Sequence, residues 1–282
     1  MEGLDLLLQP VGLDAFRREH WPDRSLVLHG HAERFAASGL LADMVDVEDV
    51  FRVRKQHVQT QFGDEGHEFE FSKLVDGASA RSAWEQGAAL RLTPFEEYSP
   101  AAAELKRDIV DAFAIPPTSV RVNAFYMRDG RGLPRHFDGR EVFNVQLAGT
   151  RSWTIEQNDA VDYPDVPMLP GCPQRGDDLL APIWKAPPPS TFGAAAESFD
   201  MEPGSVVFLP RGTWHRTSSR GVSVSLSIGC QTPTRYNLLL RALGAEARRD
   251  PALRAPVGAR TDAPSREVLD ALRRRIDAAG RE

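Results

Sequence analysis

The sequence is poor in cysteine and has no long hydrophobic run. Cys172 and Cys230 are its two cysteines, and their separation argues against a disulfide framework and favours a reducing compartment. No apolar stretch approaches the roughly 18 residues needed to span a membrane as a helix. The first residues, MEGLD, are acidic and lack the basic start of a secretory signal. The sequence therefore predicts a cytoplasmic protein that is not associated with a membrane.

The composition that remains is that of a soluble enzyme. The chain has 282 residues, 41% hydrophobic and 26% charged, which suits one large domain or one domain with an appendage. Charge is uneven, since residues 231–282 hold eleven arginines and seven acids for a net charge of +4, while the whole chain carries −6. The arginines alternate with acids along helical stretches, a pattern typical of a solvated, salt-bridged face. A surface for nucleic acid is the less favoured alternative.

The first part of the chain predicts helices with a few strands. The helix with the clearest limits begins at Ser99, an N-cap residue followed by Pro100, and is expected to end at about Ala114. The other elements expected here are helices over 12–21 and 32–41, strands over 25–30 and 89–92, and loosely patterned strands within 50–75.

From residue 118 the sequence changes to short strands divided by turn residues. Gly149 and Thr150 are expected to turn the chain between two of these strands, and a proline-rich excursion over 157–193 predicts a lid, a substrate loop or disorder. Many short strands with regular turns favour a mainly β fold with flanking helices and a jelly-roll core. The expected strands cover 120–126, 141–147, 151–155, 205–209 and 222–228.

The end of the chain is expected to be helical again. Apolar residues recur at helical spacing after Arg235, as Tyr236, Leu239 and Leu240 illustrate. Helices this short do not form a core of their own, so we expect them to pack on the β domain or to pair with a second copy of the chain. The predicted domains are therefore 1–232, a β domain with N-terminal helices, and 233–282, a helical region available for dimerisation.

The residues that point to chemistry are His136, Asp138 and His215. Alternate residues of a strand face the same side, so His136 and Asp138 can converge on one ion while Phe137 packs away from it. Two histidines and one carboxylate form the facial triad that binds Fe(II) and leaves the opposite coordination positions open. This spacing alone is weak, because a histidine beside a strand is also common in an ordinary core.

The surroundings of the three residues make the pattern more specific. Residues 203–215, PGSVVFLPRGTWH, read as a turn, an apolar strand, a second turn and then the histidine, which is how cupin-type barrels present a last ligand. Together with residues 136–153, HFDGREVFNVQLAGTRSW, the segment 16–30 and the segment 250–256, this sequence resembles the JmjC-type 2-oxoglutarate and Fe(II) oxygenases. It is nearest to their ribosomal-oxygenase branch of protein hydroxylases. The resemblance implies a double-stranded β-helix core over most of the chain and fits the 157–193 excursion poorly.

The resemblance also implies roles for individual residues. His136, Asp138 and His215 would be the catalytic iron ligands. Arg151 stands where the family has the basic residue that binds the distal carboxylate of 2-oxoglutarate, and a guanidinium suits a carboxylate because it donates two parallel hydrogen bonds. Asn123 and Ser225 match further positions that line the cosubstrate pocket in relatives.

One position departs from the family. Phe125 stands where relatives often present a tyrosine hydroxyl, and Tyr126 next to it is expected to face the other way. This substitution removes a second clamp on the cosubstrate carboxylate but does not affect the metal ligands.

The expected function is that of an iron- and 2-oxoglutarate-dependent dioxygenase that hydroxylates a C–H bond of a protein side chain, with ribosomal proteins among the candidate substrates. Fe(II), 2-oxoglutarate and O2 are the implied cofactor, cosubstrate and oxidant. Three alternatives stay open: a small-molecule hydroxylase of the same chemistry, a metal-bound cupin isomerase that does not use 2-oxoglutarate, and a binding module without activity. Arg151 argues against the second, because such enzymes have no need for a cation at that spacing.

Overall fold

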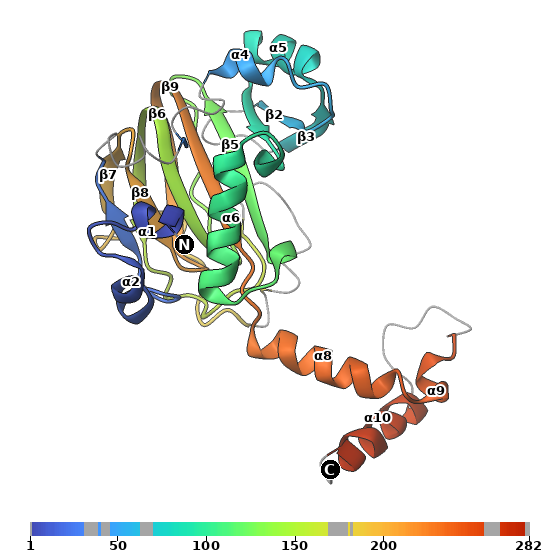
Figure 1. Ribbon diagram of the computed structural model, residues 1–282. Helices are drawn as coiled ribbons and strands as arrows, with labels where there is room; N and C mark the ends of the chain where they lie inside the picture. The colour runs from blue at the N-terminus through green and yellow to red at the C-terminus, as the bar shows by residue number, and fades with distance from the viewer. Residues whose placement is uncertain are drawn as a thin grey trace. The chain divides into compact units, whose positions relative to one another are not determined.

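The computed structural model describes residues 2–30, 39–40, 46–62, 70–168, 180, 183–256 and 266–279. The chain divides into two units, Met1–Thr232 and Pro233–Glu282. The described part of the first unit is built on an antiparallel sheet with the strand order β1-β8-β6-β9-β5-β4-β2-β3, and β7 pairs with β6 off this path (Figure 1). The strands are β1 Leu26–Leu28, β2 Val58–Phe62, β3 Glu70–Val75, β4 Ala89–Leu92, β5 Val120–Met127, β6 Glu141–Glu156, β7 Glu197–Met201, β8 Val206–Leu209 and β9 Trp214–Cys230.

The mainly β prediction with flanking helices is confirmed. The helices of the first unit are α1 Glu2–Leu7, α2 Leu13–Glu19, α4 Val47–Val50, α5 Gly77–Glu85 and α6 Pro100–Phe113, with 3-10 turns η1 Phe95–Glu97 and η2 Pro117–Ser119. The second unit contains α8 Arg235–Ala247, α9 Pro251–Arg254 and α10 Arg266–Ala279, as the helical spacing predicted. No helix among the described residues is both long and apolar enough to cross a membrane.

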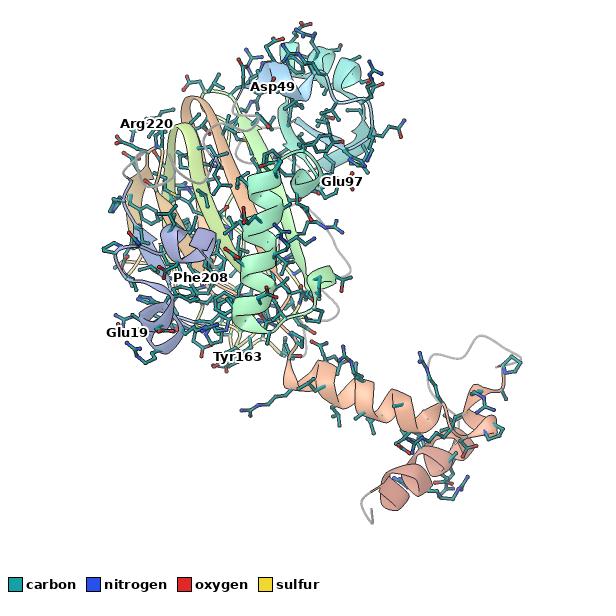
Figure 2. All side chains as sticks on the ribbon, in the orientation of Figure 1. Glu19, Asp49, Glu97, Tyr163, Phe208 and Arg220 are labelled. Carbon is teal, nitrogen blue, oxygen red and sulfur yellow. The ribbon has the colours of Figure 1, made fainter. Side chains whose placement is uncertain are left out.

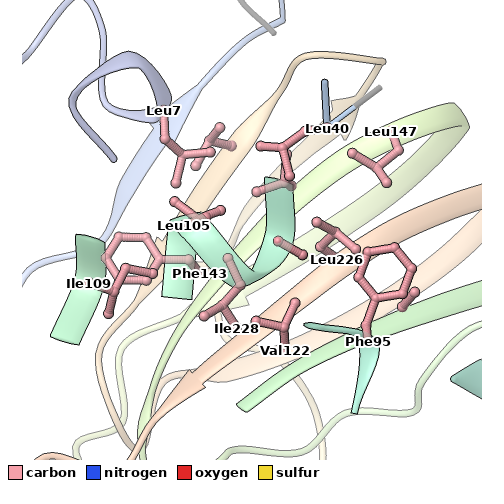
Figure 3. Close-up of a cluster of buried hydrophobic side chains, with 14 of the residues drawn as sticks. Leu7, Leu40, Phe95, Leu105, Ile109, Val122, Phe143, Leu147, Leu226 and Ile228 are labelled. Carbon is pink, nitrogen blue, oxygen red and sulfur yellow. The ribbon is translucent and has the colours of Figure 1, made fainter. Parts of the chain in front are cut away.

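The limits of α6 follow the predicted capping chemistry. The Ser99 side chain accepts a hydrogen bond from the backbone N–H of Ala102 at 3.0 Å, and Pro100 occupies the first turn. The helix ends at Ala114, whose φ of 50° is left-handed. One face of α6 packs on the sheet, where Leu105 and Ile109 meet side chains from β5, β6 and β9 (Figure 3). Each such buried side chain contributes about 1.5–3 kcal/mol to folding.

The expected turn at Gly149 and Thr150 is wrong, because β6 continues through it. β6 pairs with β9 along its length, and the register shifts between Gln146, Ala148 and Thr150. Gly149 has a φ of 65°, and a Cβ at this position would lie 2.1 Å from the Val222 carbonyl oxygen. The glycine therefore allows a bulge with close strand approach and not a chain reversal. By the same continuity, His215 lies inside β9 and not ahead of a separate strand.

The β6–β9 ribbon carries the other strands on its two sides. Its first stretch of β6 pairs with β8 and its second with β7, while β5 pairs with the last part of β9. Arg220 lies near the tip of the ribbon, where its guanidinium pairs with Asp200, and Tyr163 lies at the opposite end of the sheet (Figure 2). Because successive side chains of a strand point to opposite sides of the sheet, the long β6–β9 ribbon directs side chains to both faces along its length.

Several other elements differ from the sequence expectation. α4, α5 and β7 were not predicted, since they are short and their apolar residues are few. The helix expected over 32–41 falls almost entirely outside the described residues. The described part of the 157–193 excursion forms no extended strand, in agreement with its composition, and makes a single bridge from Met168 to Phe137.

Candidate active site

The structure brings His136, Asp138 and His215 together. His136 and His215 face each other in an isolated antiparallel bridge, in which each backbone N–H donates to the other residue's carbonyl oxygen, at 2.9 and 2.8 Å. Asp138 lies two residues along, and its carbonyl oxygen accepts a hydrogen bond from Gly212 N at 2.8 Å. Backbone pairing thus holds the two segments in register, although they are far apart in the sequence.

The histidine side chains are oriented by their Nδ1 atoms. His136 Nδ1 lies 2.7 Å from the Pro134 carbonyl oxygen, and His215 Nδ1 lies 2.9 Å from that of Thr213. A carbonyl oxygen can only accept, so each Nδ1 carries the proton and each Nε2 keeps a lone pair. Nε2 of His215 is 3.8 Å from Oδ2 of Asp138, and ligand atoms of all three residues lie within 4.8 Å of one another. This donor set can hold one divalent ion.

Burial keeps the two imidazoles neutral. His136 is 6% and His215 4% exposed. Loss of solvent lowers the pKa of both histidines, and for His215 the neighbouring His136 lowers the pKa further. Neutral imidazole is the form that binds a metal ion. The site is therefore ready to bind a metal at neutral pH without a prior loss of protons.

Arg151 lies in the same cavity as a buried cation, and no carboxylate in the described part of the chain pairs with it. Its guanidinium donates to Ser225 Oγ at 2.8 Å and to Thr217 Oγ1 at 2.9 Å, and its Nε has no partner among the described residues. Burial lowers the pKa of Arg151 to about 10, so the group stays charged at neutral pH. A buried cation supported only by hydroxyl groups is electrostatically incomplete, and an external carboxylate would complete it.

The cavity that contains these groups has a volume of about 230 Å³. Asn123 lines it as expected, whereas Ser225 does not and lies behind Arg151 as its hydrogen-bond partner. Thr217 has the same supporting role and was missed, because a threonine in an alternating strand carries no distinctive signal. The full lining consists of Arg91, Asn123, Phe125, Leu133, His136, Asp138, Arg140, Val142, Asn144, Arg151, Trp153, Pro167, His215, Ser227 and Gly229.

Phe125 and Tyr126 lie as the strand alternation predicted. Phe125 lines the cavity with its ring, and Tyr126 is fully buried in the core on the other face of β5. No tyrosine hydroxyl lines this cavity. The Arg151 guanidinium instead lies 5.9 Å from the centre of the Phe125 ring, within reach of a cation–π interaction.

A buried ion pair that the sequence did not reveal links the segment that carries Asp138 to the segment that carries His215. Glu141 follows Asp138 closely and Arg211 precedes His215. Arg211 donates from Nε to Glu141 Oε1 at 2.6 Å and from a terminal nitrogen to Oε2 at 3.1 Å, with a further bond to the Thr232 carbonyl at 2.9 Å. One weak sequence signal of this pair is that Glu141 and Arg211 each stand at one end of an apolar strand.

Arg135 connects the described part of the excursion to the domain. Its guanidinium lies 3.7 Å from the centre of the Trp214 ring and 5.1 Å from that of Phe192, and it donates to the Pro189 carbonyl at 2.5 Å. Glu156 Oε2 is 3.9 Å away. The segment that carries Pro189 and Phe192 is therefore held directly beside β9, the strand that carries His215.

Comparison with known sequences connects this site to one family. The sequence matches the JmjC domain family over residues 97–238. The uncharacterized protein YxbC of Bacillus subtilis is 29% identical over 248 residues, which cover 85% of this chain and 74% of that protein. Ribosomal oxygenase 1 of Rattus norvegicus is 23% identical over 242 residues, 80% of this chain and 36% of that protein. Ribosomal oxygenase 2 of Mus musculus is 29% identical over 103 residues, 36% of this chain and 18% of that protein. The chain thus spans about a third or less of these two ribosomal oxygenases.

Solved structures agree with the fold. The Escherichia coli protein ycfD superimposes with a TM-score of 0.58 and 17% identity, over 94% of this chain and 67% of that one. A second structure of this protein, described as a ribosomal oxygenase in complex with cobalt and 2-oxoglutarate, has a TM-score of 0.56 and 16% identity over 94% and 66% of the two chains. The predicted cupin-type double-stranded β-helix core is thereby confirmed.

Proposed function

We propose that this chain, which belongs to the JmjC domain family, hydroxylates a C–H bond of a protein side chain. It is a 2-oxoglutarate-dependent dioxygenase that takes iron as its metal and 2-oxoglutarate as its cosubstrate. One observation carries the proposal: the His136, Asp138 and His215 donors and the carboxylate-free guanidinium of Arg151 line the same cavity.

In this proposal His136, Asp138 and His215 are the iron ligands. Two neutral nitrogens and one carboxylate oxygen on one side of an ion are the donor set that non-haem Fe(II) oxygenases use. When bound, iron and 2-oxoglutarate together supply an oxidation in which O2 and 2-oxoglutarate give succinate, CO2 and one oxygen atom for the substrate. The chain itself keeps both histidines neutral through burial and aims their Nε2 atoms through the Nδ1 hydrogen bonds.

Arg151 is proposed to bind the distal carboxylate of 2-oxoglutarate. Ser225 and Thr217 hold its two terminal nitrogens, so the guanidinium is oriented before any ligand arrives. Desolvation of the cation is a cost already present in the ligand-free fold, and pairing with a carboxylate offsets it. Asn123, whose side chain donates a long hydrogen bond of 3.4 Å to the Ser227 carbonyl, is proposed to line the cosubstrate site nearby.

A protein substrate is proposed because two of the relatives are ribosomal oxygenases by name. A cavity of about 230 Å³ can admit one side chain beside the metal and the cosubstrate. A ribosomal protein is the candidate that these relatives suggest. The buried free thiol of Cys230 is compatible with the cytoplasmic location that forms part of the proposal.

A second copy of the chain is proposed as the partner of the C-terminal helices. Helix α8 leaves four large apolar residues about half exposed, which are Tyr236, Leu238, Leu239 and Leu240 at 57%, 54%, 56% and 47%. A helix that exposes leucines on several sides gains stability when a partner covers them. A homodimer through this region would provide that cover.

Thermal unfolding tests the assignment of the metal and the cosubstrate. Fe(II) and 2-oxoglutarate together should raise the melting temperature of the wild type under anaerobic conditions, because ligands that bind only the folded state stabilise it. His136→Ala or Asp138→Ala should abolish the iron-dependent part of the shift. In air, the wild type should convert 2-oxoglutarate to succinate and these variants should not.

His29→Ala provides the control, since His29 is exposed and lies outside the cavity. This variant should keep the full thermal shift and the succinate formation. A wild type that shows neither effect would contradict the proposal.

A further inference from the structure

Arginines outnumber acids in the cavity to an extent that the metal and 2-oxoglutarate do not explain. Arg91, Arg140 and Arg151 line it, and Asp138 is the one carboxylate in its lining. The two histidines beside it are neutral. In the proposed function, Asp138 would hold the iron, and Arg151 would bind one end of 2-oxoglutarate while the iron would hold the other. Arg140 is then left as a cation without a counter-charge from either ligand.

Arg140 is held in the cavity by a glycine on the neighbouring strand. A Cβ at Gly229 would lie 2.8 Å from Arg140 Cδ and 3.3 Å from one of its terminal nitrogens. The arginine stem therefore lies flat over β9, where any other residue would displace it. The guanidinium makes no hydrogen bond or ion pair with the part of the chain that the structure describes.

The positions of Arg140 and Arg151 are separate. Arg151 is bonded to Ser225, whereas Arg140 lies over Gly229, four residues further along β9. Four residues of extended chain span roughly 13 Å. The cavity therefore has one cation at the proposed cosubstrate end and another toward the opposite end.

Arg91 is the third arginine of the cavity, and its charge interacts with that of Arg140. It lies on β4 opposite Phe125, donates a hydrogen bond to the Gln59 side chain, and has its guanidinium 5.9 Å from the Phe125 ring. Burial and then the charges of Arg140 and Arg121 lower the pKa of Arg91 to about 10, while Asp138 acts in the opposite direction, so Arg91 is still a cation at neutral pH. Because Arg91 and Arg140 repel each other, an anion that binds beside Arg140 is favoured by both charges.

Neutral hydrogen-bonding groups lie between the two cationic ends. Asn144 on β6 pairs in register with Ser227 on β9, which pairs with Asn123 on β5, and all three line the cavity. The Asn144 side chain makes no hydrogen bond within the described part of the chain. A ligand group placed here would meet polar side chains on one side and guanidinium groups beyond them.

We propose that the substrate of this enzyme is acidic, and that Arg140, assisted by Arg91, binds a carboxylate of the substrate next to the carbon to be hydroxylated. The proposal rests on the proposed function, since it assigns the remaining part of the same cavity. A cationic side chain is disfavoured as substrate, because it would enter against the guanidinium group of Arg140, to which neither the metal nor 2-oxoglutarate supplies a counter-charge. Arg140 acts as a specificity residue and takes no part in the oxidation itself.

Calorimetric binding tests this inference with Mn(II) in place of iron, so that no turnover occurs, and with 2-oxoglutarate present. The probes are two nearly isosteric pairs, acetyl-Ala-Asp-Ala-amide against acetyl-Ala-Asn-Ala-amide, and benzoate against benzamide. The acid of at least one pair should bind about tenfold or more tightly than its amide, because hydrogen bonds to charged groups are the strong ones. Preference in the peptide pair indicates an acidic protein side chain, and preference in benzoate alone indicates a free carboxylic acid.

Variants at Arg140 test whether this residue causes the preference for the acid over its amide. R140Q should reduce the preference to about threefold or less, and R140K should keep most of it because the charge remains. R107Q, which removes an exposed arginine of α6, is the matched control and should leave the preference unchanged. Equal affinity for acid and amide in both pairs, or an undiminished preference in R140Q, overturns the inference.

Binding of 2-oxoglutarate to the Mn(II) protein is measured in the same calorimeter. Failure of 2-oxoglutarate to bind would contradict the proposed function. Normal binding of 2-oxoglutarate without any preference between acid and amide would contradict only the acidic substrate.

Discussion

Two buried arginines of this domain have opposite surroundings. Arg211 forms two hydrogen bonds with the Glu141 carboxylate, at 2.6 and 3.1 Å, and a third with a backbone carbonyl. Arg151 is only 2% exposed and, among the described residues, finds only the hydroxyl groups of Ser225 and Thr217. A buried charge is costly unless an opposite charge meets it. The charge of Arg211 is paired within the fold, whereas that of Arg151 is paired only when a ligand with a carboxylate binds. The difference separates a structural pair from a binding group.

The largest effect is expected when the complete pair is broken. Glu141→Ala leaves Arg211 as a buried cation without its carboxylate, which should lower the free energy of unfolding by about 3–5 kcal/mol. Urea unfolding followed by circular dichroism measures this change. The loss should be structural in origin, because Glu141 does not line the cavity.

An exposed pair provides the control for this prediction. Glu48 pairs with Arg81 at 2.8 Å, with side chains 50% and 47% exposed. Glu48→Ala should cost only about 0–1 kcal/mol, as exposed ion pairs do. Equal losses in the two variants would mean that the Glu141–Arg211 pair is not stabilising the ligand segments.

A smaller but more specific effect is expected at Arg151. Arg151→Met removes the cation and keeps an unbranched side chain, so affinity for 2-oxoglutarate should fall by about 2–5 kcal/mol, the usual cost of truncating one partner of a buried charge pair. The ligand-free protein should lose far less stability than Glu141→Ala, because no carboxylate is left unpaired. Calorimetry with Mn(II) and urea unfolding measure the two quantities.

Arg107→Met is the matched control, since this arginine is exposed on α6. It should bind 2-oxoglutarate like the wild type. If Arg151→Met instead kept its affinity for 2-oxoglutarate but unfolded as easily as Glu141→Ala, Arg151 would be a structural residue like Arg211 and not a ligand-binding group.

The smallest effect is expected at the hydroxyl groups that orient Arg151. Ser225→Ala removes one of the two hydrogen bonds to the guanidinium, which should weaken 2-oxoglutarate binding by about 1 kcal/mol, roughly fivefold. The same titration measures it, with the exposed Ser198→Ala as control. No change in Ser225→Ala would show that Arg151 is positioned by packing and not by this bond.

Much of the site could be predicted because its signals are local. The i, i+2 spacing of His136 and Asp138 determines a shared face in any extended strand. The same alternation placed Phe125 toward the cavity and Tyr126 in the core. Serine followed by proline similarly marks the start of α6 at the residue where the structure has it.

The errors arose where long-range pairing overrules local chemistry. Gly149 suggested a turn, yet the neighbouring β9 continues beside it and converts the glycine into a bulge within β6. β7 was missed because its short run of residues becomes a strand only by pairing with β6. Both outcomes depend on which strand pairs with the segment, and the local sequence of the segment does not determine that pairing.

The sequence by itself determined which side chains can do chemistry, since the alternation of a strand and the types of donor atoms are properties of short segments. The tertiary structure decided which of the buried charges are satisfied. Glu141 meets Arg211 only because two distant segments are bridged, and Arg140 occupies the cavity only because Gly229 of β9 leaves room for it. Desolvation and pairing are determined by neighbours in space, so the electrostatic character of the cavity follows from the fold.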